Sequence, residues 1–468
     1  MLESLSLWSV VIFLFTYAVI VSEKIDRSVA AFSGAAVVML AGILSPEAAI
    51  RYIDFNTIGL LVGMMIIVGI SRTTGLFEYI AVRAAKIARG EPLRVMASLS
   101  LITAVFSALL DNVTTVMLIV PVTLAITKTL GISPAPFLVA EILASNIGGT
   151  ATLIGDPPNI MIGSATDLGF MDFVINLTPV VVVVYSLTMF ILVRKYRREP
   201  GASRQSRKII MEMDERGEIK DTVLMKKSIA VMALTTLGFA VHQIIHLESS
   251  VVALSGAALL MLISKFDPER AFRSVEWPVV FFFVGLFVVV GALEETGVIE
   301  SIALFVLEKT AGAVLPASVF ILWLSALASS FIDNIPFVAT MIPLINDMGR
   351  LGFTDNMDVL WWSLSLGACF GGNGTIIGAS ANLVAVGIAQ RSGVSISFVD
   401  FFKTGFPLML MSVIISTFYI IAWYLLDTRT VLAGTLLIGA VLSVVLGRLG
   451  KRRRPQGNDS PGGGEYRD

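Results

Sequence analysis

The chain has 468 residues, of which 56% are hydrophobic and only 15% are charged, with a mean hydropathy of +0.85. So few charges cannot solvate a globule of this size, and the composition excludes a soluble protein. The single cysteine, Cys369, excludes intramolecular disulfides and multi-cysteine metal sites, whereas a net charge of −1 does not identify a partner. We therefore expect a polytopic membrane protein.

Apolar runs recur along the chain, each close to the roughly 20 residues that a helix needs to cross a bilayer. The first run, residues 5–21, lacks a basic leader and an obvious small-residue cleavage site, so we interpret it as a span and not as a signal peptide. The further runs lie near residues 29–45, 57–73, 171–193, 228–245, 249–264, 278–293, 405–425 and 430–447.

The chain contains an internal repeat with an offset of 222 residues. The segment SALLDNVTTVMLIVP around Asp111 returns as SSFIDNIPFVATMIP around Asp333. The segment IGGTATLIGDPPN around Thr152 returns as FGGNGTIIGASAN around Thr375, one residue further on. A duplicated apolar chain, interrupted by Gly, Pro and Asp at matching places, indicates a secondary transporter with a site where the repeats meet.

Basic residues mark one side of the membrane. Residues 72–94 carry five basic and two acidic side chains, and the 194–227 loop and the start of the tail at Lys451 are also basic. The positive-inside rule places all three in the cytoplasm. The repeat-equivalent of the first segment, residues 294–316, carries four acidic side chains and one basic side chain. This reversal of charge predicts that the two repeats have inverted topology.

The predicted topology fixes the side on which several residues lie. We expect Met1 outside the cell, Asp468 in the cytoplasm, and Arg83 and Glu308 on opposite faces of the membrane. The chain is predicted to be an integral, multi-pass protein of the plasma (inner) membrane with a cytoplasmic C-terminus.

The predicted fold is an all-α polytopic membrane protein with two inverted-topology repeats and an extra C-terminal span. Each repeat contains an Asp-tipped segment, which we interpret as a re-entrant hairpin, and a helix broken by Gly and Pro. Polar groups at membrane depth are tolerated only where protein or a water-filled cavity surrounds them. The predicted units are repeat 1 (1–200) with a hairpin (about 95–128) and a broken helix (about 135–165), a cytoplasmic linker (201–226), repeat 2 (227–425) with a hairpin (about 315–347) and a broken helix (about 358–390), an extra transmembrane helix (426–450) and a basic, disordered tail (451–468).

The two hairpin tips and the two broken helices are predicted to meet and to form the transport site. Unwound carbonyl groups coordinate cations, amino ends of half-helices attract anions, and Asn and Thr can do either. Asp111 and Asp333 are the sharpest signal, because a carboxylate near the bilayer midplane is costly and is kept for pairing, proton relay or ion binding. The alternative is that both Asp residues only cap the following half-helices. The predicted substrate- or ion-binding residues are Asp111, Asn112, Thr114, Thr115, Gly149, Thr150, Thr152, Gly155, Asp156, Asn159, Asp333, Asn334, Gly372, Asn373, Thr375, Gly378 and Asn382.

Other polar residues give weaker signals. Glu141, about two turns before the first unwound loop, is a candidate for proton relay or equally for a lateral ion pair, and Asp156 has no carboxylate counterpart in the second repeat. His242 and His246 lack a third ligand, so we interpret them as an interfacial pair and not as a metal site. Cys369 is interpreted as a core thiol. Beyond Na⁺ at the hairpin tips no metal is expected, and the only coupling partners expected are Na⁺ or H⁺.

At these motifs the chain resembles the ion transporter superfamily, in particular the group that joins arsenite efflux pumps, D-type sodium/proton antiporters and the pink-eyed dilution (P) protein, with citrate and dicarboxylate carriers as more distant relatives. The strings LDNVTTVMLIVPVT and SNIGGTATLIGDPPNIMI look closest to the P protein type. The resemblance covers about residues 1–447. It implies a scaffold and a transport domain in each protomer, a homodimer and an elevator-like exchange of access.

The resemblance also bears on the substrate. In the dicarboxylate carriers of this superfamily the hairpin tips carry Ser-Asn-Thr, which binds substrate carboxylate and sodium. Here Asn112 and Asn334 keep the Asn, but Asp replaces the Ser and an apolar residue replaces the Thr. Two tip carboxylates also repel a di- or trianion. Both points favour an inorganic ion, a proton or a neutral solute.

The predicted function is secondary active transport of a small inorganic ion across the lipid bilayer, driven by a proton or sodium gradient. Arsenite- or antimonite-type efflux and sodium/proton antiport are the two options, and the single cysteine excludes a thiolate complex of arsenite. A citrate- or dicarboxylate-type organic anion carrier and an anion channel-like member stay open as alternatives. An intramembrane enzyme would need a nucleophile and a base, which the chain offers nowhere outside the Asp pair. ATP use would require a separate subunit, which also stays open, and no nucleic acid partner is expected.

Overall fold

The computed structural model describes residues 2–22, 24–198, 201–310, 313–352, 356–426, 430–439 and 441. Within these residues every regular element is helical, and nine helices are long and apolar enough to cross a membrane. The two chain ends and the predicted tail (451–468) lie outside the described residues, as does most of the predicted extra span (426–450), of which a helix over residues 430–439 is described. The prediction of an all-α polytopic membrane protein is confirmed.

The two repeats contain the same succession of helices, α1 to α10 and α12 to α21, and the linker between them contains α11 (Arg204–Glu212) and the 3₁₀ turn η1 (Glu215–Glu218). The helices of repeat 1 are α1 (Leu2–Ser22), α2 (Arg27–Leu40), α3 (Pro46–Tyr52), α4 (Phe55–Arg72), α5 (Leu76–Ile87), α6 (Pro92–Leu109), α7 (Asn112–Leu130), α8 (Ala135–Gly149), α9 (Pro157–Ala165) and α10 (Phe170–Tyr196). Those of repeat 2 are α12 (Thr222–Val241), α13 (Ser249–Ser264), α14 (Pro268–Phe272), α15 (Trp277–Glu295), α16 (Val298–Thr310), α17 (Val314–Phe331), α18 (Asn334–Leu351), α19 (Asp358–Gly371), α20 (Ser380–Arg391) and α21 (Phe398–Leu425).

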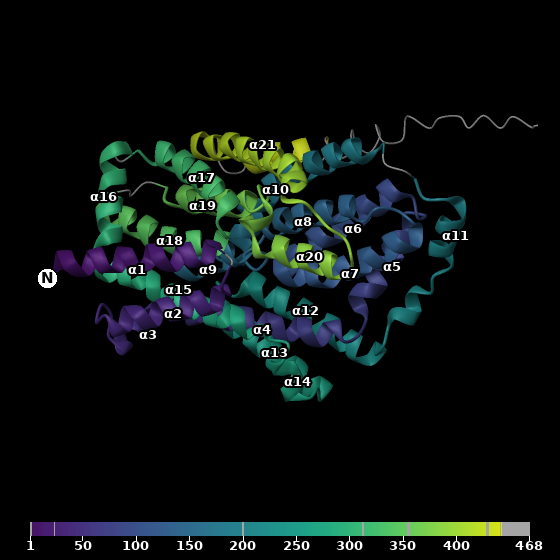
Figure 1. Ribbon diagram of the computed structural model, residues 1–468, viewed down its shortest axis with the longest axis horizontal. Coiled ribbons are helices and arrows are strands. Elements are labelled where there is room, and N and C mark those ends of the chain that lie inside the picture. Colours follow the sequence, from purple (N-terminus) through teal and green to yellow (C-terminus); the bar gives the residue numbers. More distant parts are fainter. Residues whose placement is uncertain are drawn as a thin grey trace, which may run out of the picture.

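Equivalent helices of the two repeats lie at opposite ends of the molecule. In Figure 1, α5 lies near α11 toward the right end, whereas its counterpart α16 stands at the left end. The helices α6 and α7 lie on the right, and their counterparts α17 and α18 lie on the left. The repeats therefore have inverted topology, as the reversed charge of the two connecting segments predicts.

The membrane helices form two groups by their packing; in Figure 1, α2, α4 and α13 of the first lie toward the bottom, and α17, α19 and α21 of the second toward the top. In the first, which we call the crossed group (α1, α2, α4, α12, α13, α15), α2 packs along α15 and α4 along α13. In the second, the hairpin group (α6 to α10 and α17 to α21), α6 packs against α8 and α17 against α19. The two pairs α2–α15 and α4–α13 each join a helix of repeat 1 to a helix of repeat 2. Neither repeat therefore completes its packing alone.

Glycines at equivalent positions permit the crossings in the crossed group. A Cβ atom on Gly63 would lie 2.6 Å from the backbone of Ala253, and one on Gly285 would lie 2.4 Å from the backbone of Ala31. Helices in a membrane associate through such small residues, because their backbones can then approach closely. Gly63 and Gly285 occupy equivalent positions in the two repeats, and each allows one of the two close helix crossings.

Each hairpin consists of two helices joined by two residues, Leu110 and Asp111 in the first and Ile332 and Asp333 in the second. The tips lie beside the interruptions of the broken helices. The hydroxyl group of Thr152 donates a hydrogen bond to the carbonyl oxygen of Ala108 at 2.6 Å, just before the first tip. The equivalent Thr375 makes the same bond at the second tip. Both segments therefore turn back at the level of the breaks, as a re-entrant hairpin does.

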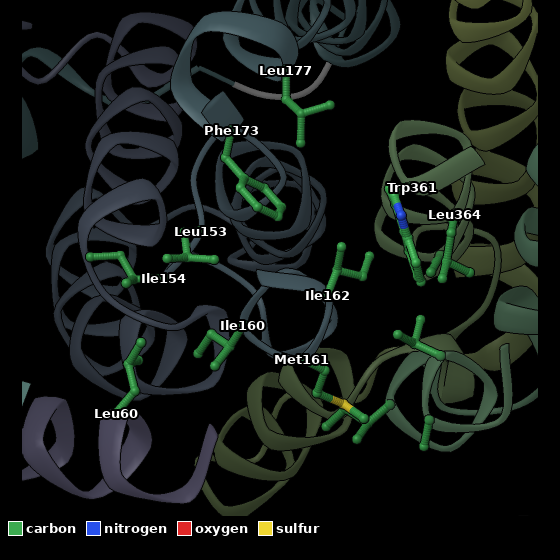
Figure 2. Packing of buried hydrophobic residues seen from close by; sticks show 14 of the residues in the cluster. Leu60, Leu153, Ile154, Ile160, Met161, Ile162, Phe173, Leu177, Trp361 and Leu364 are labelled. Carbon is green, nitrogen blue, oxygen red and sulfur yellow. The ribbon is translucent and has the colours of Figure 1, made fainter. Parts of the chain in front are cut away.

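The broken helices are interrupted between α8 and α9 and between α19 and α20, where the 3₁₀ turn η2 (Ile376–Gly378) lies. Pro157 and Pro158 begin α9, where a missing N–H costs nothing. Figure 2 shows Leu153 of the unwound loop and Met161 of α9 among buried apolar side chains from α4, α10 and α19, including Phe173. This apolar anchoring fixes the loop in place next to the hairpin tips.

The linker lies against the basic end of repeat 1. Lys86 of α5 donates hydrogen bonds to the carboxylate of Glu215 and to the carbonyl oxygen of Met213, the latter at 2.8 Å. The Lys86 hydrogen bond also holds the pKa of Glu215 below its usual range. The amide of Lys220 donates to the carbonyl oxygen of Thr74 at 2.9 Å. The linker is therefore fixed to α5 before α12 begins.

Candidate functional site

Asp111 and Asp333 are the N-caps of the second helix of each hairpin. Asp111 accepts hydrogen bonds from the amide of Thr114 at 2.8 Å and from its hydroxyl group at 2.5 Å. Asp333 accepts one from the amide of Ile335 at 3.1 Å. Both Asp residues therefore have the geometry of a helix cap, as the capping interpretation expects. Capping does not require a charge, since Asn caps about as well as Asp, and a carboxylate that caps a helix retains further lone pairs for a ligand.

Asn146 of α8 joins the first hairpin tip to the second broken helix. Asn112 donates to the Oδ1 atom of Asn146 at 3.2 Å, and the Nδ2 atom of Asn146 donates to Asn373 at 3.0 Å and to Asn382 at 2.9 Å. Sequence reasoning missed Asn146. The available signal was an amide side chain one turn before the Gly-Gly break, at a position where the second repeat has Cys369.

The second hairpin tip lies next to Asp156, in the first broken helix. The Nδ2 atom of Asn334 lies 3.2 Å and 3.5 Å from the two carboxylate oxygens of Asp156, whose side chain is fully buried. The equivalent of Asp156 in the second repeat is Ala379. The centre of the molecule is therefore asymmetric in charge, although its backbone follows the repeat.

Several predicted ligands instead hold the unwound loops together. Their amide side chains donate to loop carbonyl oxygens that were expected to coordinate a cation, so one lone pair of each oxygen is already used. The bonds run from Asn159 to Thr150 and Thr152 at 3.2 and 2.9 Å, and from Asn382 to Gly372 and Thr375 at 2.7 and 2.9 Å. The hydroxyl group of Thr150, at the end of α8, donates to the backbone carbonyl oxygen of Asn146 at 2.8 Å.

The predicted glycines permit close contact between backbones at the breaks. A Cβ atom on Gly155 would lie 2.5 Å from the carbonyl oxygens of Gly149 and Ser107, the second of which belongs to the first hairpin. The same crowding recurs in the second repeat at Gly372 and Gly378. Contact with the hairpins accounts for Gly149, Gly155 and Gly378, whereas Gly372 faces Ala379 and Gly378 of its own broken helix.

Buried polar atoms without a hydrogen-bond partner in the described structure occur at the first tip. They include Oδ1 of Asn112 and Oγ1 of Thr115. Leaving such an atom unpaired costs roughly 1–3 kcal/mol, so a polar solute is the natural partner for them. Glu141 lies further along α8, where Thr123 donates to one of its oxygens at 2.5 Å and the other oxygen has no partner among the described residues.

Among the described residues, charged side chains near the hairpin tips include Asp111, Asp156, Asp333 and Arg27. Asp156 lies within electrostatic range of Asp111 and Asp333, and Glu276 within range of Asp111 and Arg27. Arg27 forms an ion pair with Asp333 at 2.7 Å. Sequence reasoning did not identify Arg27 or Glu276. The carboxyl groups favour cations between the tips, whereas the larger cavity that leads there is also lined by Arg72, Arg270 and Arg273.

Two cavities related by the repeat lead from opposite sides toward the hairpins, and they differ in size. The larger, about 630 Å³, reaches Thr114 beside the first tip, at the end of the molecule that carries the linker. The smaller has a volume of about 220 Å³. Equivalent lining residues are Gly69 and Gly291, Arg72 and Glu294, Met117 and Ala339, and Glu276 and Asp54.

The second hairpin is tied to the crossed group beside the smaller cavity. Tyr17 of α1 donates to the carbonyl oxygen of Pro336 at 2.5 Å and lies 2.9 Å from the hydroxyl group of Thr340. The repeat-equivalent of Tyr17 is Phe239, which has no hydroxyl group. The larger cavity therefore lies on the side of the linker, and the hydrogen bonds of Tyr17 hold the second hairpin on the side of the smaller one.

Cys369 and His242 have structural partners. The Sγ atom of Cys369 lies 3.6 Å from Oδ1 of Asn159, in a buried position. The Nδ1 atom of His242 lies 2.9 Å from the carbonyl oxygen of Leu247, and its Nε2 atom accepts from the amide of Phe170 at 3.4 Å. The histidine therefore fixes the entry into α10.

Comparison with known proteins identifies the family. A family profile described as "citrate transporter" matches residues 17–367. The chain belongs to the citrate transporter family. As a member of that family it is a membrane transporter, and membership implies a carrier rather than an enzyme.

Relatives from bacteria and animals agree with the family. The chain is 44% identical over 423 residues to an uncharacterized transporter of Mycobacterium tuberculosis, covering 89% of this chain and 98% of the relative. It is 42% identical over 426 residues to a 46 kDa membrane protein of Mycobacterium leprae, with 90% and 99% covered. It is 34% identical over 497 residues to the human P protein, covering 86% of this chain but only 58% of the P protein. The predicted resemblance to the P protein group is confirmed.

A solved structure also supports the fold. The YdaH transporter of Alcanivorax borkumensis, whose crystal structure revealed an unusual topology, superposes with a TM-score of 0.52 over 90% of this chain and 98% of its own. The two sequences are 13% identical, so the likeness shows the fold alone.

Proposed function

We propose that this member of the citrate transporter family is a secondary active transporter that exchanges a small inorganic ion against protons or sodium. The observation that carries the proposal is the set of three carboxyl groups at the hairpin tips and the first broken helix: Asp111, Asp156, which Asn334 contacts at 3.2 Å, and Asp333, which pairs with Arg27. Carboxylates at membrane depth are costly and are kept for ion binding or proton relay. Sodium/proton antiport is the form of transport that this set supports best.

A neutral inorganic solute is the second candidate. The unpartnered oxygens of Asn112 and Thr115 at the first tip suit a hydroxylated molecule such as arsenous acid, which would bind through hydrogen bonds while the Asp residues exchange protons. Thiolate binding of arsenic is not available, because soft coordination needs several cysteines and the chain has one.

A citrate-like substrate, which the family description suggests, is disfavoured by charge. A trianion bound between the tips would lie near Asp111, Asp156 and Asp333, where Arg27 is already paired with Asp333. The arginines of the larger cavity, Arg72, Arg270 and Arg273, lie along the approach to the first tip. Like charges in a poorly screened site repel strongly, so such a substrate would need several cations or protons bound beforehand.

The unequal cavities support alternating access. One cavity of about 630 Å³ leads to the first tip, while its repeat-equivalent has shrunk to about 220 Å³. In inverted-repeat transporters the two repeats exchange conformations when access changes sides. We propose that the hairpin group moves against the crossed group in an elevator-like manner, within a homodimer in the plasma membrane.

The test is reconstitution into vesicles that contain a pH-sensitive dye. We expect an external pulse of Na⁺, or of arsenite, to move protons, and a pulse of citrate or succinate to move none. Asp111→Asn should abolish the signal, because the amide still caps α7 but carries no charge. Asp214→Asn is the matched control, since Asp214 caps the 3₁₀ turn η1 of the linker and lines neither cavity. Uptake of citrate or succinate that depends on Asn112 and Asn334 would contradict the proposal.

A further inference from the structure

Arg27, at the start of α2, reaches from the crossed group to the second hairpin. Its guanidinium group forms an ion pair with Asp333 at 2.7 Å, hydrogen-bonds Ser380 and lies 5.2 Å from the ring centre of Phe282. Ser380, the first residue of α20, donates to the same oxygen of Asp333. One carboxylate oxygen therefore ties together α2, the second hairpin tip and the second broken helix.

The first hairpin tip has no such arrangement. The repeat-equivalent of Arg27 is Ser249, and in the described part of the chain Asp111 forms no ion pair and is hydrogen-bonded by Thr114. Acidic groups near Arg27 include Asp26 beside it and Glu276, the N-cap of α15. The two tips are alike in sequence, but only the second carries a cation supplied by the protein.

The ion pair lies between the two helix groups that alternating access requires to move. Arg27 belongs to the crossed group, whereas Asp333 and Ser380 belong to the hairpin group. The pair is only partly shielded, with exposed side-chain fractions of 27% for Arg27 and 11% for Asp333, and it borders a cavity of about 290 Å³. An ion pair in contact with solvent can open at moderate cost, so it suits a contact that forms in one state and breaks in the other.

We propose that Arg27 is a positioning residue that acts as a resident counter-cation. It holds the second tip through Asp333 and Ser380 while the cavity beside the first tip is open, and it releases Asp333 when access changes sides. Asp111 then offers its carboxylate to the transported species, whereas Asp333 is neutralised by the protein itself. The inference rests on the proposed function only in that transport requires two access states.

Two repeat-equivalent positions report the access state without any substrate. Met117 lines the larger cavity and Ala339 the smaller one. A cysteine at either position is labelled by a water-soluble maleimide, with the protein in nanodiscs so that both faces are accessible. The native Cys369 is fully buried and does not compete. In the otherwise unaltered protein we expect faster labelling at position 117 than at 339.

Replacing the arginine should shift the two labelling rates in opposite directions. With Arg27→Gln we expect labelling of Ala339→Cys to rise and labelling of Met117→Cys to fall, by up to about fivefold, as suits the loss of one partly exposed ion pair. Arg27→Lys should restore most of the difference, and Asp333→Asn should reproduce Arg27→Gln with no further change when the two are combined. Arg391→Gln, at the exposed end of α20, is the matched control and should leave both rates unchanged.

The outcomes separate this inference from the proposed function. Opposite shifts support the resident cation even if none of the tested solutes moves protons in vesicles. Unchanged rates overturn it even if transport is measured. A rise at both positions also overturns it, because it shows a loosened fold and not a change of access.

Discussion

Asn146 uses three of its four hydrogen-bonding positions on the side chains of Asn112, Asn373 and Asn382. A buried amide that is paired on both its oxygen and its nitrogen specifies one arrangement of the helices around it. Its repeat-equivalent Cys369 lies 3.6 Å from Oδ1 of Asn159 and also contacts Asp156, but a thiol forms only weak hydrogen bonds. The same backbone position therefore carries a structural junction in one repeat and a small thiol in the other.

This asymmetry gives a prediction with an internal control. Asn146→Ala leaves three buried polar groups without that partner, at a cost of roughly 1–3 kcal/mol each, so we expect a marked fall in the thermal unfolding temperature and loss of transport. Cys369→Ala, at the equivalent position, should change stability by less than about 1 kcal/mol and retain transport. Thermal unfolding of both variants in detergent measures the difference. Equal effects would contradict the role assigned to Asn146.

Candidate site residues could be predicted from the sequence where the same residue recurs at equivalent positions of both repeats. Asp111 and Asp333 stand out because the same polar letters recur inside apolar segments. Asn146 and Arg27 do not recur in the other repeat, and their partners are 236 and 306 positions away. Which side chains meet across such distances depends on how the repeats cross, and a one-dimensional pattern does not contain that information.

The broken helices show what local chemistry determines at the level of elements. Adjacent glycines followed by prolines cannot sit in an unbroken helix, so the interruption after α8 is predictable from the sequence. The sequence pattern did not reveal that polar side chains of the loop hydrogen-bond to the loop's own backbone. Asn159 and Asn382 were expected to face an ion, whereas their amide groups hold the loop carbonyls. An unwound loop must first satisfy its own backbone, and only the remaining groups can serve a ligand.

The glycines of the break give the prediction at this scale. In Gly155→Ala the new methyl group would lie 2.5 Å from two carbonyl oxygens, so the first hairpin must shift. Overpacking of this kind costs typically about 1–3 kcal/mol, and we expect a lower unfolding temperature and weaker transport. Gly387→Ala in α20 meets no atom within 4 Å and should be neutral or slightly stabilising, since Ala favours a helix. Similar unfolding temperatures for the two variants would contradict the packing role of Gly155.

For the whole molecule, the sequence predicts two repeats of opposite orientation, and the structure places α5 and α16 at opposite ends (Figure 1). The sequence does not predict that one cavity has a volume of about 630 Å³ and its repeat-equivalent a volume of about 220 Å³. The two repeats share the same succession of helices, so we interpret the difference in volume as one of two access states, which side chains present in only one repeat, such as Arg27, can favour.

The orientation of the whole molecule in the membrane is the last prediction. Arg83 on α5 and Glu308 on α16 are both exposed and belong to repeat-equivalent helices whose charge is reversed. Because basic segments stay in the cytoplasm, an impermeant maleimide applied to intact cells should label Glu308→Cys and leave Arg83→Cys unlabelled until the cells are permeabilised. Labelling of Arg83→Cys alone would preserve the inverted repeats but reverse the orientation. Labelling of both in intact cells would contradict the inversion itself, because two helices at opposite ends of a membrane protein cannot both face the medium.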